Sequence, residues 1–167
     1  GGYIVELEQR GYVVTGAFTP EIALTHPSAV KELHVEMKLA GCDVLQVMAF
    51  YGSREKLSTV GYGDKVFEIN SAATYIAKEV AGNDLLVAGD LSTTWMWDKK
   101  NPNTDKIVSD MFDEQIKAQQ ELDFIIGSYT TFPSPTKLSQ TRFPSFSWKK
   151  KKQPITPKET VYNRIMA

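Results

Sequence analysis

Three short apolar runs, spaced about forty residues apart, constrain the fold more than any other feature of the sequence. They cover residues 43–49, 85–90 and 122–126, and each is preceded by a segment with helical character. A continuous apolar run of this length is typical of a strand buried on both faces of a sheet. Helices between such strands imply right-handed crossovers. The sequence therefore predicts an α/β fold with a parallel sheet.

The segment before the first run has helical spacing of apolar side chains. Short helices are predicted over 3–9 and 21–24. A longer helix begins at Pro27, a residue suited to the first helical position, and ends at Gly41. Its apolar face recurs at i, i+3, i+4 and i+7; the residues are Val30, Leu33, His34 and Met37.

The two later connections also predict helices. An apolar stripe runs from residue 66 to residue 80 and stops at Gly82. In the second connection Thr104 is predicted to cap a helix. The buried face of that helix is predicted to carry Val108, Met111, Phe112 and Gln115.

An aromatic pair, Phe50 and Tyr51, directly follows the first predicted strand. The loop after a parallel strand is a usual place for ligand chemistry in α/β proteins. Taken alone, the two rings are also compatible with simple packing at the strand end.

Other residues near the predicted strand ends have two readings each. Asp90 is either a functional carboxylate or an ordinary loop-start residue. Trp95 and Trp97 either line the mouth of a site or cover the core, and we expect the second. His34 lies on an apolar helical stripe and is expected to be a packing residue rather than a metal ligand, because no cysteine or second histidine has the right spacing.

Charge is distributed unevenly along the chain. Residues 128–167 carry eight basic side chains and one acid, Glu159, so this segment has a net charge of +7 and residues 1–127 have −8. The segment is rich in Ser, Thr, Pro and Lys and shows no helical or strand period. We expect a mostly disordered basic tail over 128–167 and treat the lysines at 149–152 as a solvated run, with no nucleic-acid partner.

The sequence contains one cysteine, Cys42, so an internal disulfide and a cysteine-rich zinc site within the chain are both excluded. There is no apolar run of about 18 residues, and no membrane association is expected. A signal peptide is not recognisable, and a cytoplasmic location is the default expectation.

Four segments together resemble a known family. GGYIVELEQRGY, GAFTPEIALTHPSAVKELHVEM, AGCDVLQVMAFYGSREKL and LDFIIG resemble the betaine–homocysteine type of the homocysteine S-methyltransferase family, over residues 1–127. The resemblance implies part of a parallel (β/α)8 TIM-type barrel, with about three strands and their helices. It also implies methyl transfer from a betaine-like or sulfonium donor to the thiol of homocysteine, with zinc as the family's cofactor.

The resemblance implies a substrate-binding role for particular positions. Gly1, Gly2 and Tyr3 match the element that holds the amino-acid end of homocysteine, and glycines would let a zwitterion meet backbone N–H groups. Phe18 matches an aromatic residue near the methyl donor. Phe50 and Tyr51 match the aromatic pair beside substrate and donor, and aromatic faces suit a cationic donor.

The chain also departs from the family pattern. A family glutamate that grips the substrate's amino group corresponds to Ser128, and the zinc-binding cysteines are not present in this chain. Cys42 starts the first predicted strand at the end away from the site and is not taken as a ligand. No catalytic residue and no metal ligand is therefore assigned, and the chain alone is expected to be truncated and inactive.

A second reading of the sequence is a non-catalytic fragment that associates with an intact homologue through exposed barrel edges. A homo-oligomer is also possible.

A third reading is a small flavodoxin-like domain, which requires a glycine-rich phosphate turn directly after a strand. Gly61 and Gly63 do not follow a strand.

Overall fold

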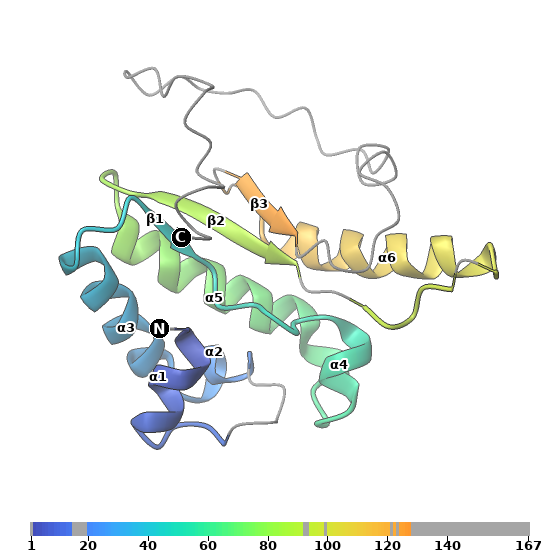
Figure 1. Cartoon of the computed structure of the whole chain (residues 1–167), viewed down its shortest axis with the longest axis horizontal. Coiled ribbons are helices and arrows are strands. Elements are labelled where there is room, and N and C mark those ends of the chain that lie inside the picture. The colour runs from blue at the N-terminus through green and yellow to red at the C-terminus, as the bar shows by residue number, and fades with distance from the viewer. Residues whose placement is uncertain are drawn as a thin grey trace. The chain divides into compact units, whose positions relative to one another are not determined.

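The computed structural model describes residues 2–14, 20–91, 94–98, 100–120, 122 and 124–127. The described residues all fall within residues 1–133, one of two units into which the chain divides. The predicted basic tail, Gly1, Phe18 and Ser128 lie outside the described residues. The elements, drawn in Figure 1, are α1 (Tyr3–Gln9), α2 (Ile22–Thr25), α3 (Pro27–Leu39), β1 (Val44–Gln46), α4 (Arg54–Ser58), η1 (Gly63–Lys65), α5 (Val66–Ala81), β2 (Leu86–Leu91), α6 (Asn103–Ala118) and β3 (Phe124–Gly127).

The three strands form one parallel sheet in the order β1-β2-β3, which confirms the predicted parallel α/β class. Leu45 of β1 is opposite Val87 of β2, and Asp90 of β2 is opposite Ile126 of β3. Strands that are consecutive in the chain are therefore neighbours in the sheet. A sequential parallel order is that of a β/α-barrel segment. The barrel itself stays a prediction, because the described strands form an open sheet.

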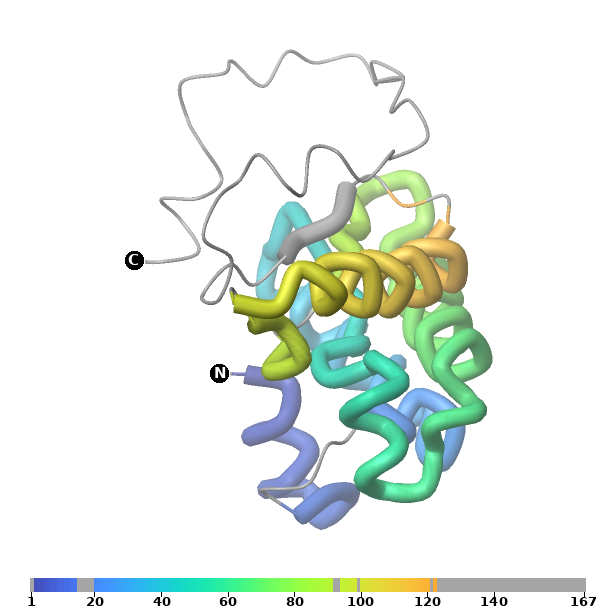
Figure 2. Tube along the Cα trace, turned by 90° about the vertical axis from the view of Figure 1, so that its right-hand side faces the viewer, coloured from blue at the N-terminus to red at the C-terminus, as the bar shows by residue number. Residues whose placement is uncertain are grey.

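One face of the sheet carries the helices. Leu45 and Val87 belong to a core that includes buried side chains of α1, α2, α3 and α5. Leu91, which lies on the same face of β2 as Val87, packs against Val108, Met111 and Phe112 of α6. Figure 1 shows α5 lying beneath β1 and β2, and Figure 2 shows α6 in yellow crossing beside α5 in green.

The helices follow the periodicity of the sequence. In α3 the side chains of Val30, Leu33 and His34 are buried, Pro27 is in the first turn, and Gly41 follows the helix with φ +87°. In α5 the six apolar side chains of the predicted stripe are all buried; they are Val66, Ile69, Ala73, Ile76, Ala77 and Val80. None of the helices in the described part of the chain is long and apolar enough to cross a bilayer.

Several element boundaries differ from the sequence-based predictions, and strand β2 is displaced by one residue, to Leu86–Leu91. Helix α2 is displaced by one residue, to Ile22–Thr25. Strand β1 ends at Gln46 rather than at residue 49, because the Ala49 N–H turns back to the Val47 carbonyl at 2.9 Å. Strand β3 begins at Phe124, two residues later than expected.

Thr104 is not the cap of α6, so that prediction was wrong. The helix already begins at Asn103, with Pro102 before it. The Thr104 hydroxyl instead accepts a hydrogen bond from the Asp98 N–H at 3.0 Å and donates one to the Asn101 carbonyl at 2.7 Å. Its role is to fasten the preceding loop to the first turn of α6.

Two buried side-chain amides join the ends of the strands. Gln119, just after α6, accepts a hydrogen bond from the Asp90 N–H at 2.9 Å and donates to the Asp90 carbonyl at 2.9 Å. The same Gln119 amide donates to Asn70 Oδ1 at 2.8 Å, and Asn70 donates to the Gly52 carbonyl at 2.9 Å. The loop after β1 is thereby connected to the end of β2 through α5 and the end of α6.

Gly52 is required by this arrangement. A Cβ atom at residue 52 would lie 2.8 Å from the Ala49 carbonyl oxygen and 2.9 Å from the Asn70 amide nitrogen. Such distances are too short for any side chain, so glycine allows the backbone to approach Asn70 closely.

Asp90 is a buried titratable group near the end of β2, with 3% of its surface exposed. Burial raises the pKa of its carboxyl from 3.8 to about 7, and a side-chain hydrogen bond with Gln46 opposes the increase. The folded state therefore binds more protons than the unfolded state between about pH 4 and pH 7, so stability falls as the pH rises through this range.

We expect Gln119→Leu to lower the free energy of unfolding by about 3 kcal/mol, because it leaves the backbone of Asp90 and the amide of Asn70 buried without their partner. Urea unfolding measures the change. The matched control is Gln120→Leu at the exposed neighbouring position, with an expected effect within about 0.5 kcal/mol. Equal effects of the two substitutions would contradict the bridging role.

We expect Asp90→Asn to be more stable than the wild type at pH 8, with the difference shrinking toward pH 4. The separation of the folded and unfolded pKa values sets an upper bound of about 4 kcal/mol. Urea unfolding across this pH range measures the effect. Asp43→Asn, at an exposed carboxylate before β1, is the control and should leave the pH dependence unchanged. A pH profile that Asp90→Asn does not flatten would refute the assignment.

Candidate functional site

The candidate site lies at the carboxyl ends of β1 and β2. The chain leaves β1 at Gln46, passes through three buried residues, and reaches Phe50 and Tyr51, both of which are half-buried. The ring centroids of Phe50 and Tyr51 are 4.2 Å apart, with an interplanar angle of 47°. The structure thus brings the two predicted aromatic residues into contact at the predicted end of the strand.

Tyr51 has an unusual backbone conformation. Its φ angle is +68°, in the left-handed region that bulky side chains seldom adopt. A residue is held in such a conformation only when its surroundings fix it, and such residues are frequent at functional sites.

A lysine that was not among the predicted site residues lies against Tyr51 of this pair. Lys56 of α4 has 2% of its surface exposed, and its Nζ atom is 4.0 Å from the centroid of the Tyr51 ring. The same ammonium group is 5.0 Å from the Trp95 ring. Burial lowers the pKa of Lys56, and the charge of Glu55 acts in the opposite direction. Rings from two separate loops thus face one cation.

Glu55 links α4 to the loop after β2. The Thr94 hydroxyl donates a 2.8 Å hydrogen bond to Glu55 Oε2, and it accepts one from the Met96 N–H at 3.0 Å. Burial raises the pKa of Glu55, while the Thr94 hydrogen bond and the Lys56 charge lower it.

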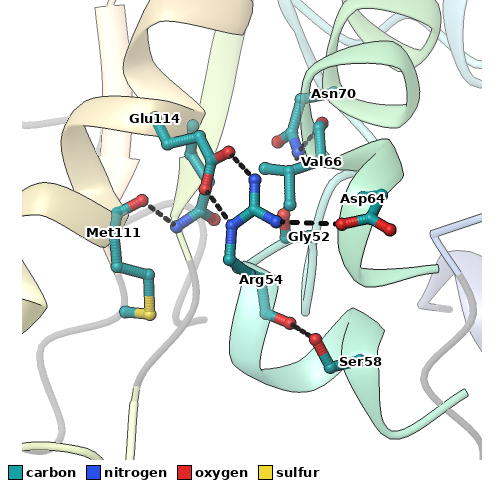
Figure 3. A network of polar contacts seen from close by, with 9 residues as sticks. Gly52, Arg54, Ser58, Asp64, Val66, Asn70, Met111 and Glu114 are labelled. Carbon is teal, nitrogen blue, oxygen red and sulfur yellow. Dashed lines mark hydrogen bonds and ion pairs between the residues drawn. The ribbon is translucent and has the colours of Figure 1, made fainter. Parts of the chain in front are cut away.

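The outer side of α4 is held by Arg54. As Figure 3 shows, its guanidinium group lies between Glu114 of α6 and Asp64 of η1. Arg54 Nε donates to Glu114 Oε2 at 3.2 Å, and a second ion pair joins the same two side chains. The inner side of α4 is held by Leu57, which is fully buried against Val66 and Ile69. These contacts fix the helix that carries Lys56.

Tyr3 and Gly2, predicted to bind the amino-acid end of homocysteine, lie at the start of α1. Gly2 is exposed. Tyr3 is half-buried, and its hydroxyl group is joined to His34 Nδ1 by a 3.0 Å hydrogen bond. Burial raises the pKa of Tyr3, and a hydrogen bond with the backbone of Gln46 opposes the increase. Tyr3 therefore meets β1 at the end from which the Phe50–Tyr51 loop departs.

The structure agrees with the expectations for His34 and Trp97 and differs from the expectation for Trp95. His34 is fully buried, which confirms that it is a packing residue, and burial lowers its pKa to about 4. Trp97 packs against the α6 core and donates to Asp105 at 2.8 Å. Trp95 does not cover the core, because 59% of its surface is exposed. It lies beside Lys56 instead.

Zinc is the cofactor that the family resemblance implies, and the residues in hand do not fit it. Within the described ranges there is no group of three or more His, Cys, Asp or Glu side chains that could hold a metal ion. Cys42, the one cysteine of the sequence, precedes the amino end of β1, whereas the aromatic pair follows its carboxyl end. We assign no thiol-activating step to the described residues.

Comparisons with known proteins agree with the resemblance found in the sequence. The chain is 39% identical to betaine–homocysteine S-methyltransferase 1 of Bos taurus and 41% identical to that of Xenopus tropicalis, in each case over 136 residues. It is 36% identical over 132 residues to the S-methylmethionine–homocysteine S-methyltransferase BHMT2 of Pongo abelii. Each comparison covers 77% of this chain and 33% or 34% of the relative.

The chain thus spans about a third of the length of these relatives. The family model described as homocysteine S-methyltransferase matches residues 1–139, which extends beyond residue 127, the predicted end of the resemblance. The match includes all the described elements, from α1 to β3. The chain belongs to the homocysteine S-methyltransferase family.

Proposed function

We propose that this chain supplies the methyl-donor side of a homocysteine S-methyltransferase site. The observation that carries the proposal is the ammonium group of Lys56 against the Tyr51 and Trp95 rings, at 4.0 and 5.0 Å. The rings of Tyr51 and Trp95, which we call the aromatic platform, attract an ammonium group, and the same ring electrostatics attract a quaternary ammonium or a sulfonium. The names of the relatives mention betaine and S-methylmethionine, which carry these two groups.

In this proposal Phe50 and Tyr51 contact the donor, while Gly2 and Tyr3 lie toward the amino-acid end of homocysteine. Gly1 and Phe18 keep the roles that the family pattern implies, as proposals. Methyl transfer consumes the positive charge of the donor and the negative charge of the thiolate. Surroundings poor in water, such as half-buried aromatic rings, strengthen the attraction between these two charges.

The partial barrel is proposed on the same basis. Sequential parallel strands with helices on one face support a partial barrel. The loop after β1, which carries Phe50 and Tyr51, then lies at the carboxyl end of the strands, where barrel enzymes have their sites. We further propose that the purified chain binds a donor but does not by itself methylate homocysteine, since the described residues offer no zinc ligand set.

A second candidate function is association with an intact relative. It is favoured by the open edges of the sheet, because among the described strands β1 and β3 each pair on one side only. Co-purification at fixed stoichiometry with a full-length betaine–homocysteine S-methyltransferase supports this candidate. A chain that sediments as a monomer in such a mixture excludes it.

We expect Tyr51→Ala to weaken binding of trimethylglycine by about 10-fold, because it removes one aromatic wall of the platform. Isothermal titration calorimetry of the purified chain measures the dissociation constant, and S-methylmethionine is tested in parallel. Tyr51→Phe keeps the ring and should bind almost as the wild type does.

Tyr75→Ala is the matched control for this experiment. Tyr75 is a tyrosine of α5 with 69% of its surface exposed, and its loss should leave donor binding unchanged. If the wild-type chain binds neither trimethylglycine nor S-methylmethionine, the proposed function is contradicted. Homocysteine methylation by the purified chain would contradict the part of the proposal that separates binding from transfer.

A further inference from the structure

The buried position of Lys56 has no explanation in the sequence pattern. It lies in the charged run REKLS of α4, which is typical of a solvated helix face. Arg54, in the same helix, has half of its side chain exposed, whereas Lys56 has 2% of its surface exposed. A buried cation costs free energy unless other groups replace its water. Lys56 must therefore be compensated by its neighbours.

The compensating groups come from two loops at the carboxyl ends of two strands. Tyr51 belongs to the loop after β1 and Trp95 to the loop after β2, and both rings lie within 5.0 Å of the Lys56 ammonium group. Glu55 adds a negative charge next to it in the chain. The ammonium group is thus a shared contact between the two loops.

Glu55 reinforces the same connection through a different bond. Its carboxylate accepts the hydrogen bond from Thr94, the residue before Trp95. Two adjacent residues of one short helix therefore hold both loops, Lys56 by its contacts with the rings and Glu55 by a hydrogen bond. The helix itself is fixed by Leu57 inside and by Arg54 outside.

The conformation of Tyr51 indicates what this connection achieves. A φ angle of +68° is unfavourable for tyrosine, and it persists only where other contacts compensate. The ammonium group over the ring is such a contact, because it holds the ring plane in one orientation. Without it, the backbone of residue 51 would be free to relax and the ring would leave the platform.

We propose that Lys56 is a positioning residue, which fixes the rings of Tyr51 and Trp95 so that they can receive a cationic methyl donor. The donor part of this statement rests on the proposed function. The positioning part rests on the burial, the ring contacts and the backbone of Tyr51. Lys56 acts through the rings, and the proposal does not require it to touch the donor.

The test compares Lys56→Met, Lys56→Arg and Lys65→Met with the wild type. Methionine keeps the length and apolar packing of lysine without its charge, and arginine restores a cation over the rings. Lys65 is an exposed lysine of η1 and provides the control. Near-ultraviolet circular dichroism reports how rigidly Tyr and Trp rings are held, and calorimetry gives the dissociation constant of trimethylglycine.

We expect Lys56→Met to reduce the aromatic dichroism and to raise the dissociation constant about 10-fold, equivalent to about 1.4 kcal/mol. Lys56→Arg should recover most of both signals, and Lys65→Met should match the wild type. An unchanged dichroism spectrum in Lys56→Met overturns the positioning role.

A changed spectrum with unchanged donor affinity also overturns the proposal, because the contact would then serve stability alone. If the wild type itself does not bind trimethylglycine, the proposed function and the donor part of the inference fail together. The dichroism of the three variants then tests the positioning of the rings independently. Failure of the proposed function, seen as no donor binding by the wild type, is thus distinguishable from failure of the positioning role, seen as an unchanged spectrum in Lys56→Met.

Discussion

The arrangement of the site depends on a chain of buried amide hydrogen bonds from Gly52 through Asn70 and Gln119 to Asp90. Parallel strands are joined by their ladder, but nothing in a ladder fixes the loops that follow. Here the Gln119 amide binds both backbone groups of one β2 residue, as a neighbouring strand would. Its link through Asn70 to Gly52 then sets the position of the loop after β1. Tyr51, one of the two rings against Lys56, belongs to that loop.

Periodicity predicted the frame of the fold well. The predicted faces of α5 and α6 are buried as expected, and so is that of α3 apart from the half-buried Met37, because a helix in contact with a sheet must present one apolar face to it. The parallel order followed from the spacing of three apolar runs. Strand ends were predicted less well. Val47 is as buried as Leu45 of β1, yet the chain turns directly after it, and burial alone does not reveal a turn.

The candidate site was predicted in part. Phe50 and Tyr51 were found because they follow a strand, a signal that is local in sequence. Lys56 and Gln119 were missed, since their environments are created by residues far away in the chain. A lysine in a charged run such as that of Lys56 is predicted to be solvated, and the sequence does not show that Trp95 of the next loop lies beside it. To predict the role of Gln119, one would have needed to know which β2 residue lies opposite the end of α6.

The position of Arg54 has a consequence for how the site responds to its surroundings. Helix α4 is held on one side by apolar packing, which ionic strength hardly affects. On the other side the half-exposed Arg54 pairs with Glu114 and with the fully exposed Asp64. Dissolved salt screens exposed pairs of this kind. An increase in ionic strength therefore loosens the helix on its solvent side and leaves the sheet and its core intact. The contacts that α4 makes with the loop after β1 therefore depend on ionic strength through Arg54.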